Sequence, residues 1–365
     1  MSWRNRVEVS YGALKHNVGA IKAAAGGRHV VAVVKADAYG LGLERCARIY
    51  RDAGVAALAV AALSEADRVR IAVPEARVIL LGSPLPEERP AVVASAFEVS
   101  CSTREEVLGF AALATPRAPA AIHLMVDTGM GRFGSLPDEA ERLAKLVLAS
   151  PTLRLAGIAT HYPMADIDEV ATGQEAALAH LLSRLGPLPP GCWIHYANSE
   201  GVLLRPAGPS VAVRTGLLLT GVLPDNCPDP GVVPAVRWVS SLSLIKTLPA
   251  GHGVSYNRTR VLTRETRAGI IPVGYADGYP IALSNRGSVL IQGKRCPILG
   301  RVTMDYIIVD ITALPHPPTP GEAVVLLGAQ GQEFISVAEL ARLAGTIPYD
   351  ILCGLRGRCE VVGVP

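Results

Sequence analysis

Several features of nucleic-acid-binding and membrane proteins are missing from this 365-residue sequence. It has no run of basic residues and its formal net charge is only +3, so nucleic acid is not an expected partner. No window approaches the roughly 18 consecutive apolar residues of a transmembrane helix, so no membrane association is expected. Only 18% of the residues are charged and 50% are hydrophobic, which predicts a folded core rather than disorder.

A disulfide framework and a cysteine-based metal motif are also missing. The seven cysteines are odd in number and include no C-x-x-C pair, which predicts free and mostly buried thiols. Such thiols are typical of a reducing compartment. Residues 1–17 lack the apolar core of a signal peptide. We therefore expect a cytoplasmic protein and predict no metal site.

Eight short apolar segments recur through the first two-thirds of the chain. Most are continuous, as in strands covered on both faces, and amphipathic stretches of helical period separate them. Ser102 and Glu105 have capping-box spacing at the start of one such stretch. The alternation predicts a closed (β/α)8 barrel, with an open doubly wound sheet as the competing fold. The predicted strands are residues 30–34, 55–61, 78–82, 97–101, 121–126, 153–160, 192–197 and 211–219.

A second, mostly β domain is predicted after the proline-rich segment 223–234. Strand-like pieces follow one another there without intervening helices, apart from one helix with a capping box at Ser336 and Glu339. We expect the barrel to span residues 1–234 and the β domain residues 235–365. Residues 1–9 precede the first barrel helix and are expected to pair with the β domain as an extra strand.

Polar side chains follow several of the predicted barrel strands. Active sites of such barrels collect at the carboxyl ends of the strands, so these side chains are expected to share one rim. They are Lys35, Asp127, Arg132, His161, Asn198, Ser199 and Arg214.

Lys35 ends the valine-rich segment VVAVVKADAYG. A buried ammonium is costly unless it is paired or its charge is removed. One interpretation is a lysine whose long stem reaches solvent. The other is a Schiff-base lysine, whose nitrogen becomes part of an imine. Uncharged phosphate donors nearby, namely Tyr39, Ser199 and the Gly216 backbone, favour the second interpretation and suit a pyridoxal phosphate tail.

Two further segments carry weaker signals. GMGRFG (129–134) has the G-x-G-x-x-G form, but the next strand ends in His161 where a dinucleotide site needs an acidic residue. GHGVSYNRTR (251–260) places Tyr256 in a polar context, where local evidence favours a tyrosine half-buried at a strand edge. GRVTMDYI (300–307) offers Met304 and Asp305 in a predicted strand, without a role.

Taken together, the motifs resemble those of the alanine racemases, which are fold-type III pyridoxal-phosphate enzymes. The resemblance spans nearly the whole chain and keeps the order of the motifs. They are AVVKADAYGLG, VDTGMGRFG, GIATHY, ANSEG, VRTGLLLTG, GVSY, PVGYADGYP, GRVTMDYIIVD and TIPYDILC.

The resemblance implies interconversion of L- and D-alanine, with D-alanine supplied for peptidoglycan. It implies that Lys35 and Tyr256 are the catalytic bases on opposite faces of the substrate. It also implies a homodimer in which Tyr256 reaches the Lys35 site of the partner subunit. The implied substrate-binding residues are Arg132 and the Met304 backbone. The implied cofactor-binding residues are Lys35, Tyr39, His161, Asn198, Ser199, Arg214, Gly216, Leu217 and Tyr349.

Two positions depart from the family pattern. Met125 stands where a lysine, commonly carbamylated, often lies, so no carbamyl-lysine is expected and Arg132 needs another partner, Asp127 or Asn198. Asn257 stands where glycine usually follows the catalytic tyrosine, and Asn tolerates positive φ.

Three alternatives stay open. The first is a serine or broad-specificity racemase, since an apolar pocket rejects an added hydroxyl only about a hundredfold. A decarboxylase of ornithine or diaminopimelate type is expected to be longer and to carry other C-terminal cysteines. A non-catalytic pyridoxal-phosphate carrier is expected to lack the β domain with its GVSY and TMDY segments.

Overall fold

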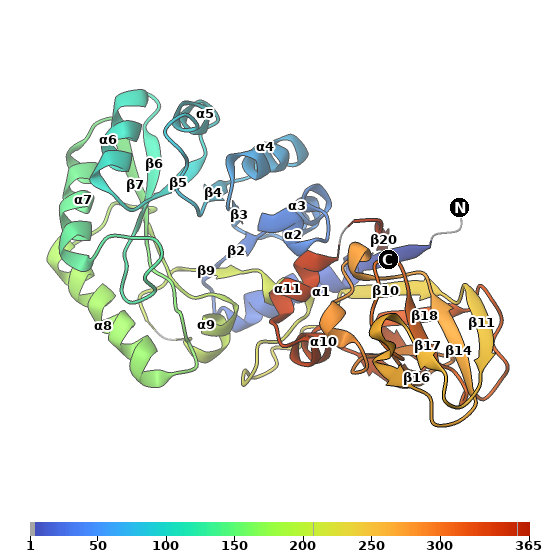
Figure 1. Cartoon of the computed structure of the whole chain (residues 1–365). Helices are drawn as coiled ribbons and strands as arrows, with labels where there is room; N and C mark the ends of the chain where they lie inside the picture. Colours follow the sequence, from blue (N-terminus) through green and yellow to red (C-terminus); the bar gives the residue numbers. More distant parts are fainter. Residues whose placement is uncertain (1–3, 207, 356) are drawn as a thin grey trace. The chain divides into compact units, whose positions relative to one another are not determined.

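The computed structural model describes residues 4–206, 208–355 and 357–365 (Figure 1). The chain divides into two compact units, each described here by itself. The barrel unit contains residues 14–38 and 42–233, and the β unit contains the described residues up to 13, residues 39–41, and the described residues from 234 onward. Residues 1–3 and 207 of the predicted range 1–234, and residue 356 of 235–365, lie outside the described residues.

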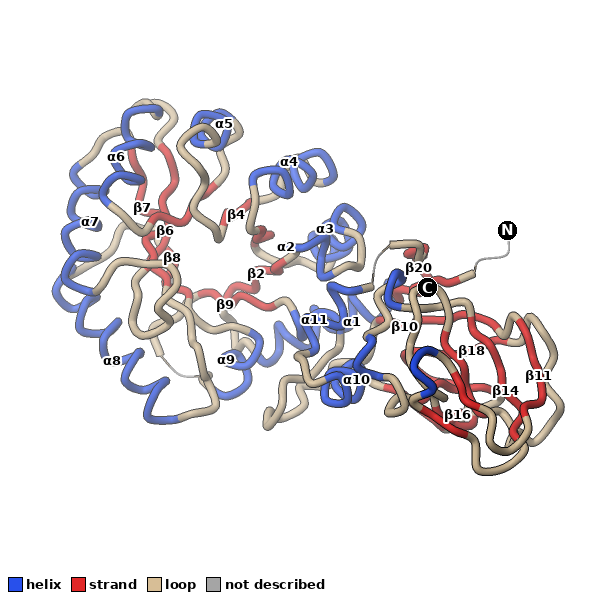
Figure 2. The backbone as a smooth tube through the Cα atoms, viewed as in Figure 1, coloured by secondary structure: helices blue, strands red, loops and turns tan. Residues whose placement is uncertain are grey.

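The barrel unit is a closed barrel of eight parallel strands with helices outside it (Figure 2). The last strand pairs with the first, for example Val30 with Val213, so the predicted barrel is confirmed and the open sheet is wrong. The strands are β2 (His29–Val33), β3 (Ala57–Val60), β4 (Val78–Leu80), β5 (Glu98–Cys101), β6 (Ala120–Met125), β7 (Leu153–Ala159), β8 (Trp193–His195) and β9 (Ala212–Thr215).

Helices alternate with the strands as the amphipathic stretches predict. Their apolar faces are buried and their charged faces exposed, as in Leu43–Asp52, where Leu43, Cys46, Ala47 and Tyr50 are buried. They are α1 (Tyr11–Ala24), α3 (Leu43–Asp52), α4 (Leu63–Ala72), α5 (Arg89–Ala94), α6 (Arg104–Leu113), α7 (Pro137–Ala149), α8 (Asp168–Leu185) and α9 (Ser199–Leu204).

Two local predictions in the barrel unit are wrong. The capping box of α6 is formed by Thr103 and Glu106, not by Ser102 and Glu105. The Ser102 hydroxyl instead accepts a hydrogen bond from the Gly134 backbone N–H at 2.9 Å. The predicted strand 211–219 ends at Thr215, and the short 3-10 helix η1 (Leu217–Thr220) follows it.

The β unit is built on a seven-stranded sheet of order β16-β15-β18-β10-β1-β20, with β19 paired to β18. A three-stranded sheet, β11-β14-β17, and the hairpin β12-β13 complete it. Strand β1 (Asn5–Ser10) lies antiparallel to β10 and parallel to β20, so both ends of the chain enter this sheet. The other strands are β10 (Val236–Ser241), β11 (Leu244–Leu248), β12 (Gly253–Val254), β13 (Arg260–Val261), β14 (Thr266–Ile271), β15 (Ser288–Ile291), β16 (Lys294–Pro297), β17 (Ile307–Asp310), β18 (Ala323–Gln330), β19 (Glu333–Ile335) and β20 (Glu360–Val364).

Short helices lie between these strands. Ser336 caps its helix as predicted, accepting from the Glu339 N–H at 2.9 Å, whereas the Glu339 carboxylate pairs with Arg295. Met304 and Asp305 lie in a loop before β17, so the predicted strand there is wrong. Among the described residues, no helix has the length and apolarity to span a membrane. The helices are α10 (Val337–Ala344), α11 (Pro348–Gly354), η2 (Tyr256–Arg258), η3 (Tyr275–Asp277) and η4 (Ile281–Leu283).

Candidate active site

The barrel brings together four of the residues expected on its rim: Lys35, Arg132, His161 and Arg214, called here the rim cluster. They follow or end β2, β6, β7 and β9. Burial, together with the positive charges of Arg214, Arg132 and Lys35, lowers the pKa of His161 to about 3. His161 is therefore a neutral imidazole at neutral pH, surrounded by cations.

The backbone immediately after Lys35 turns in the left-handed sense. The segment α2 (Lys35–Tyr39) has φ values of 52°, 56°, 55° and 59° at its four residues after the lysine, none of which is glycine. A left-handed turn costs L-residues about 1–2 kcal/mol each, so roughly 4–8 kcal/mol is stored directly beside Lys35. Such strain persists only where surrounding groups hold it.

Asp37 and Glu65 hold this turn directly, and Arg68 and Glu44 support Asp37. Oδ1 of Asp37 accepts hydrogen bonds from the Leu43 backbone N–H at 3.1 Å and from the Arg68 guanidinium at 2.7 Å. Arg68 is itself fixed by Glu44, at 2.6 and 2.9 Å. Glu65 accepts from the Ala36 N–H at 2.6 Å. These contacts fix the path on which the chain leaves Lys35.

Arg214 is held by several hydrogen bonds within the barrel unit. Its side chain is buried and donates to the Thr160 carbonyl at 2.8 Å, to Nδ1 of His161 at 3.1 Å and to Nδ1 of His195 at 2.8 Å. Burial and the neighbouring Arg132 lower its pKa to about 10, so it stays charged at neutral pH. Because a guanidinium has only donors, any ring nitrogen facing it must be an acceptor.

The loop that carries Arg132 is organised by Asp127. Its carboxylate accepts from the backbone N–H groups of Gly129, Met130 and Gly131 at 2.9 to 3.1 Å. Burial raises the pKa of Asp127, but these hydrogen bonds outweigh it and lower the pKa overall. Asp127 therefore shapes the backbone on which Arg132 stands, and Arg132 itself is exposed.

A set of uncharged donors lies where β9 ends. The hydroxyl of Ser199 lies 3.3 Å from the Gly216 N–H and 3.5 Å from the Leu218 N–H, which are long contacts. Leu217, which lies between Gly216 and Leu218 in the sequence, is buried. Oδ1 of Asn198 accepts from the Gly201 N–H at 2.8 Å, so Asn198 caps α9. These hydroxyl and backbone N–H groups make only long hydrogen bonds with one another and carry no negative charge. They therefore suit an anion such as a phosphate.

The β unit holds the remaining predicted residues. The rings of Tyr39 and Tyr349 lie 5.8 Å apart, and Tyr39 is buried while Tyr349 is 36% exposed. Tyr256 is 69% exposed, so the half-buried strand-edge interpretation is wrong. Positive φ values at Ser255 (63°) and Asn257 (60°) surround it, and Asn is one of the residues that tolerates this conformation.

The Met304 loop is held from two sides within the β unit. Arg358 donates to Asp277 at 3.1 Å and to Asp305 at 2.7 Å. Backbone hydrogen bonds run from the Tyr275 N–H to the Thr303 carbonyl and from the Ala276 N–H to that of Met304. Met304, 52% exposed, thus stands on a fixed loop.

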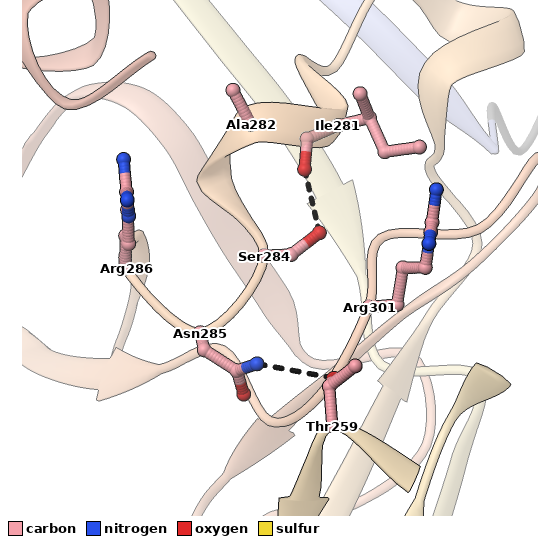
Figure 3. A pocket seen from close by; sticks show the side chains of 7 residues that line it. All are labelled: Thr259, Ile281, Ala282, Ser284, Asn285, Arg286 and Arg301. Carbon is pink, nitrogen blue, oxygen red and sulfur yellow. Dashed lines mark hydrogen bonds between the residues drawn. The ribbon is translucent and has the colours of Figure 1, made fainter. Parts of the chain in front are cut away.

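A pocket of about 360 Å³ lies beside the Tyr256 turn in the β unit (Figure 3). Arg286 and Arg301 line it on opposite sides of the view, and Asn285 donates to the Thr259 hydroxyl at 3.1 Å. Two guanidinium groups make this pocket favourable for an anionic group.

Several residues that shape the site escaped the sequence-based predictions. Arg68 and Glu65 hold the turn after Lys35, and Gln174 donates to the His161 carbonyl at 3.1 Å. All three lie on helices whose patterns only indicate amphipathicity. The sequence does contain a signal for His123 and His195, because a histidine inside an apolar barrel strand must find a hydrogen-bond partner.

The barrel, the β unit and the rim cluster define a barrel enzyme with a lysine at its active rim. Family models agree over both parts of the chain: residues 9–224 match the alanine racemase N-terminal domain and residues 235–362 the alanine racemase C-terminal domain. The chain therefore belongs to the alanine racemase family, and it is an isomerase that acts on alanine.

Individual relatives support this assignment along the full length. The alanine racemase of Symbiobacterium thermophilum is 38% identical over 368 residues, covering 96% of this chain and 94% of that protein. The crystal structure of alanine racemase from E. faecalis superposes with a TM-score of 0.91 at 31% identity, covering 98% of each chain. That of Bartonella henselae, with covalently bound pyridoxal phosphate, has a TM-score of 0.91 at 27% identity and covers 100% of each chain.

Proposed function

We propose that this protein interconverts L- and D-alanine with pyridoxal 5'-phosphate as cofactor, using Lys35 and Tyr256 as its two proton-transferring groups. The observation that carries the proposal is the rim cluster, in which a lysine after β2 stands among Arg132, Arg214 and the neutral His161. Family membership over both units supports the same conclusion.

The donor chemistry of the described residues fits this cofactor. The hydroxyl of Ser199 and the Gly216 and Leu217 backbone form a phosphate-binding set, to which we add Tyr39 and Tyr349. Asn198 supports this set by capping α9. When bound, pyridoxal phosphate withdraws electrons from the substrate Cα and so makes its proton removable. The Lys35 amine supplies the covalent attachment.

The charged residues are proposed to orient cofactor and substrate. Arg214 would face the pyridine nitrogen of the bound cofactor, where a donor-only group would keep that nitrogen unprotonated. His161, fixed by Arg214, is the neutral hydrogen-bond partner of the second base. Arg132 and the Met304 N–H hold the substrate carboxylate.

Racemisation requires a proton to leave one face of the substrate Cα and to arrive on the other. One group does this poorly, so two are needed. We assign Lys35 to the α-proton of the D-enantiomer and Tyr256 to that of the L-enantiomer. The exposure of Tyr256 in the single chain is what a residue that serves another subunit requires.

A homodimer with shared active sites follows from this assignment. Mixing Lys35→Ala subunits with Tyr256→Phe subunits should restore about one competent site per heterodimer, which circular dichroism of alanine solutions measures. Each variant alone should be inactive. No recovery in the mixture would show that both groups act within one chain.

Substrate preference is tested with purified wild-type protein. We expect the optical rotation of L-alanine to decay to zero, and that of L-serine to decay more slowly. Borohydride treatment should bleach the cofactor colour and fix the label on Lys35. A label at any other lysine would overturn the site assignment, and faster turnover of serine would favour the serine or broad-specificity racemase.

The biological setting is also a proposal. D-alanine made by this enzyme would supply peptidoglycan synthesis, and a cytoplasmic location agrees with the seven cysteines, which are thiols rather than disulfides. We retain 1–234 and 235–365 as functional domains, with the strand β1 serving the second through its pairing with β10 and β20.

A further inference from the structure

The interior of the barrel contains a continuous line of polar side chains. Such interiors are normally filled with branched apolar residues. Here four side chains from four different strands contact one another in sequence along the barrel. We call this set the buried column: Glu98 of β5, His123 of β6, His195 of β8 and Arg214 of β9.

The contacts of the buried column are short and sealed from solvent. Nε2 of His123 lies 2.6 Å from the Glu98 carboxylate, and Nδ1 of His123 lies 2.7 Å from Nε2 of His195. Nδ1 of His195 lies 2.8 Å from the Arg214 guanidinium. Both histidines are 0% exposed, and the two charged ends are 8% and 6% exposed.

The chemistry of the ends fixes every proton along the buried column. Arg214 can only donate, so Nδ1 of His195 accepts and its Nε2 carries the hydrogen. That hydrogen is donated to Nδ1 of His123, whose own hydrogen is then on Nε2 and points at Glu98. A second proton on either ring would set two donors against each other. Both imidazoles are therefore neutral, in the same tautomer.

The Glu98 end of the buried column lies at the amino-terminal end of the barrel, where other side chains hold it. The Glu98 carboxylate also accepts from Arg77 at 2.8 Å and from Arg154 at 3.2 Å. Burial raises the pKa of Glu98, but the hydrogen bonds from His123 and Arg77 outweigh it and lower the pKa to about 2. Arg77 is in turn stacked on Trp193, 3.5 Å from the ring centre. The anion is thus permanent at neutral pH.

The strand beside His123 makes room for this arrangement. A Cβ on Gly157 of β7 would lie 2.3 Å from Nδ1 of His123, the atom that accepts from His195. No positive φ requires glycine at this position. The glycine is therefore explained by the space that the ring needs.

We propose that Glu98 and His123 are positioning residues for the racemase reaction, acting through His195 to hold Arg214 in place. The inference rests on the proposed function, in which Arg214 faces the cofactor. The anion at the base and the guanidinium at the rim are joined by two polarised imidazoles, so each hydrogen bond strengthens the next. Loss of any link leaves a buried donor or acceptor unpaired and weakens one of the restraints on Arg214, which the Thr160 carbonyl also holds.

The first test observes the apoprotein directly. Nitrogen-15 NMR of histidine-labelled protein, assigned with His123→Leu and His195→Leu, should show both rings neutral with hydrogen on Nε2 from pH 6 to 8. An imidazolium, or hydrogen on Nδ1 of either ring, would overturn the proposal. This readout does not depend on activity.

The second test uses holoenzyme kinetics in both directions. We expect His123→Leu to lower kcat about tenfold or more while the KM for alanine changes less than about twofold, because Arg132 lies outside the buried column. The kcat of Glu98→Gln should lie between those of His123→Leu and the wild type. Glu98→Gln carries the test if His123→Leu does not fold. Gly157→Ala should lower kcat similarly, without removing any polar group.

A matched control separates the buried column from general packing at the barrel base. His29 stacks on Trp193 with ring centres 4.8 Å apart and is outside the buried column. His29→Leu should retain kcat within about twofold. An equal loss in this variant, or an unchanged kcat in His123→Leu and Glu98→Gln, would refute the positioning role. An inactive wild type would instead refute the proposed function, and the NMR result would still decide the direction of the hydrogen bonds.

Discussion

The left-handed turn after Lys35 predicts strong coupling between the two carboxylates that hold its backbone. Asp37 and Glu65 hold this turn independently, one through the Leu43 N–H and Arg68, the other through the Ala36 N–H. We consider the single variants Asp37→Ala and Glu65→Ala and the double variant.

The expected loss of stability follows from the contacts that each variant removes from the turn. Asp37→Ala removes one backbone hydrogen bond, worth about 0.5–1.5 kcal/mol, and one half-exposed ion pair, worth about 0.2–1 kcal/mol. We therefore expect a loss of about 1–2 kcal/mol, which is only part of what opposes the strain, since Ala38 and Tyr39 of the turn are also buried. The turn survives one loss because the other side chain still holds it. When both are lost, the segment should relax and Lys35 should lose its orientation.

The assay is a double-mutant cycle on the apoprotein by urea unfolding, with pyridoxal phosphate binding followed by absorbance. The double variant should weaken cofactor binding by tenfold or more, whereas each single variant weakens it only slightly. Asp37→Asn is the matched control, since it keeps an oxygen for the Leu43 N–H. Binding losses that simply add, or an Asn variant as weak as the Ala variant, would refute the reasoning that stored strain is shared between the two carboxylates.

Three further predictions concern the β unit and the barrel base. In Gly274→Ala, the new Cβ would lie 2.2 Å from the Met304 carbonyl oxygen, so the loop must move and the KM for alanine should rise about tenfold; an unchanged KM would remove this loop from the site. Asn257→Gly should leave the urea midpoint nearly unchanged, whereas Asn257→Val should cost more than about 1 kcal/mol, because φ is 60° there. The depressed pKa of Glu98, about 2 against a usual 4.5, contributes stability above pH 4.5 that is lost as the pH falls towards 2. The stability difference between wild type and Glu98→Gln should therefore shrink by about 3 kcal/mol over that range, and a constant difference measured by urea unfolding would contradict it.

The barrel was predictable because its strands are local and continuous. Segments such as residues 30–34 and 153–160 are apolar on both faces, and only a sheet covered on both sides buries them fully. The alternation with helices then leaves few topologies. Boundaries were less certain, and the capping pair of α6 was misplaced by one residue because Ser102 and Thr103 both fit the pattern.

The rim residues were predictable for the same reason. Lys35, His161 and Arg214 each stand at or near the end of an apolar strand, and parallel strands of a barrel end on one rim. Their positions in the sequence were therefore enough to predict that they lie on the same rim. The loop conformation of Met304 was not predictable, since the apolar pattern of GRVTMDYI fits a strand equally well.

By itself, the sequence determined the closed barrel, the β unit after the proline-rich segment, and the identity of the chemical groups on the rim. These depend on periodicity and chain order, which the linear pattern contains. Only the tertiary structure decided the left-handed turn after Lys35, the hydrogen bonds by which Arg68 and Glu65 hold it, and the buried column from Glu98 to Arg214. Each of these joins residues from different strands and helices, and such contacts are set by packing and hydrogen-bond geometry that no local pattern encodes.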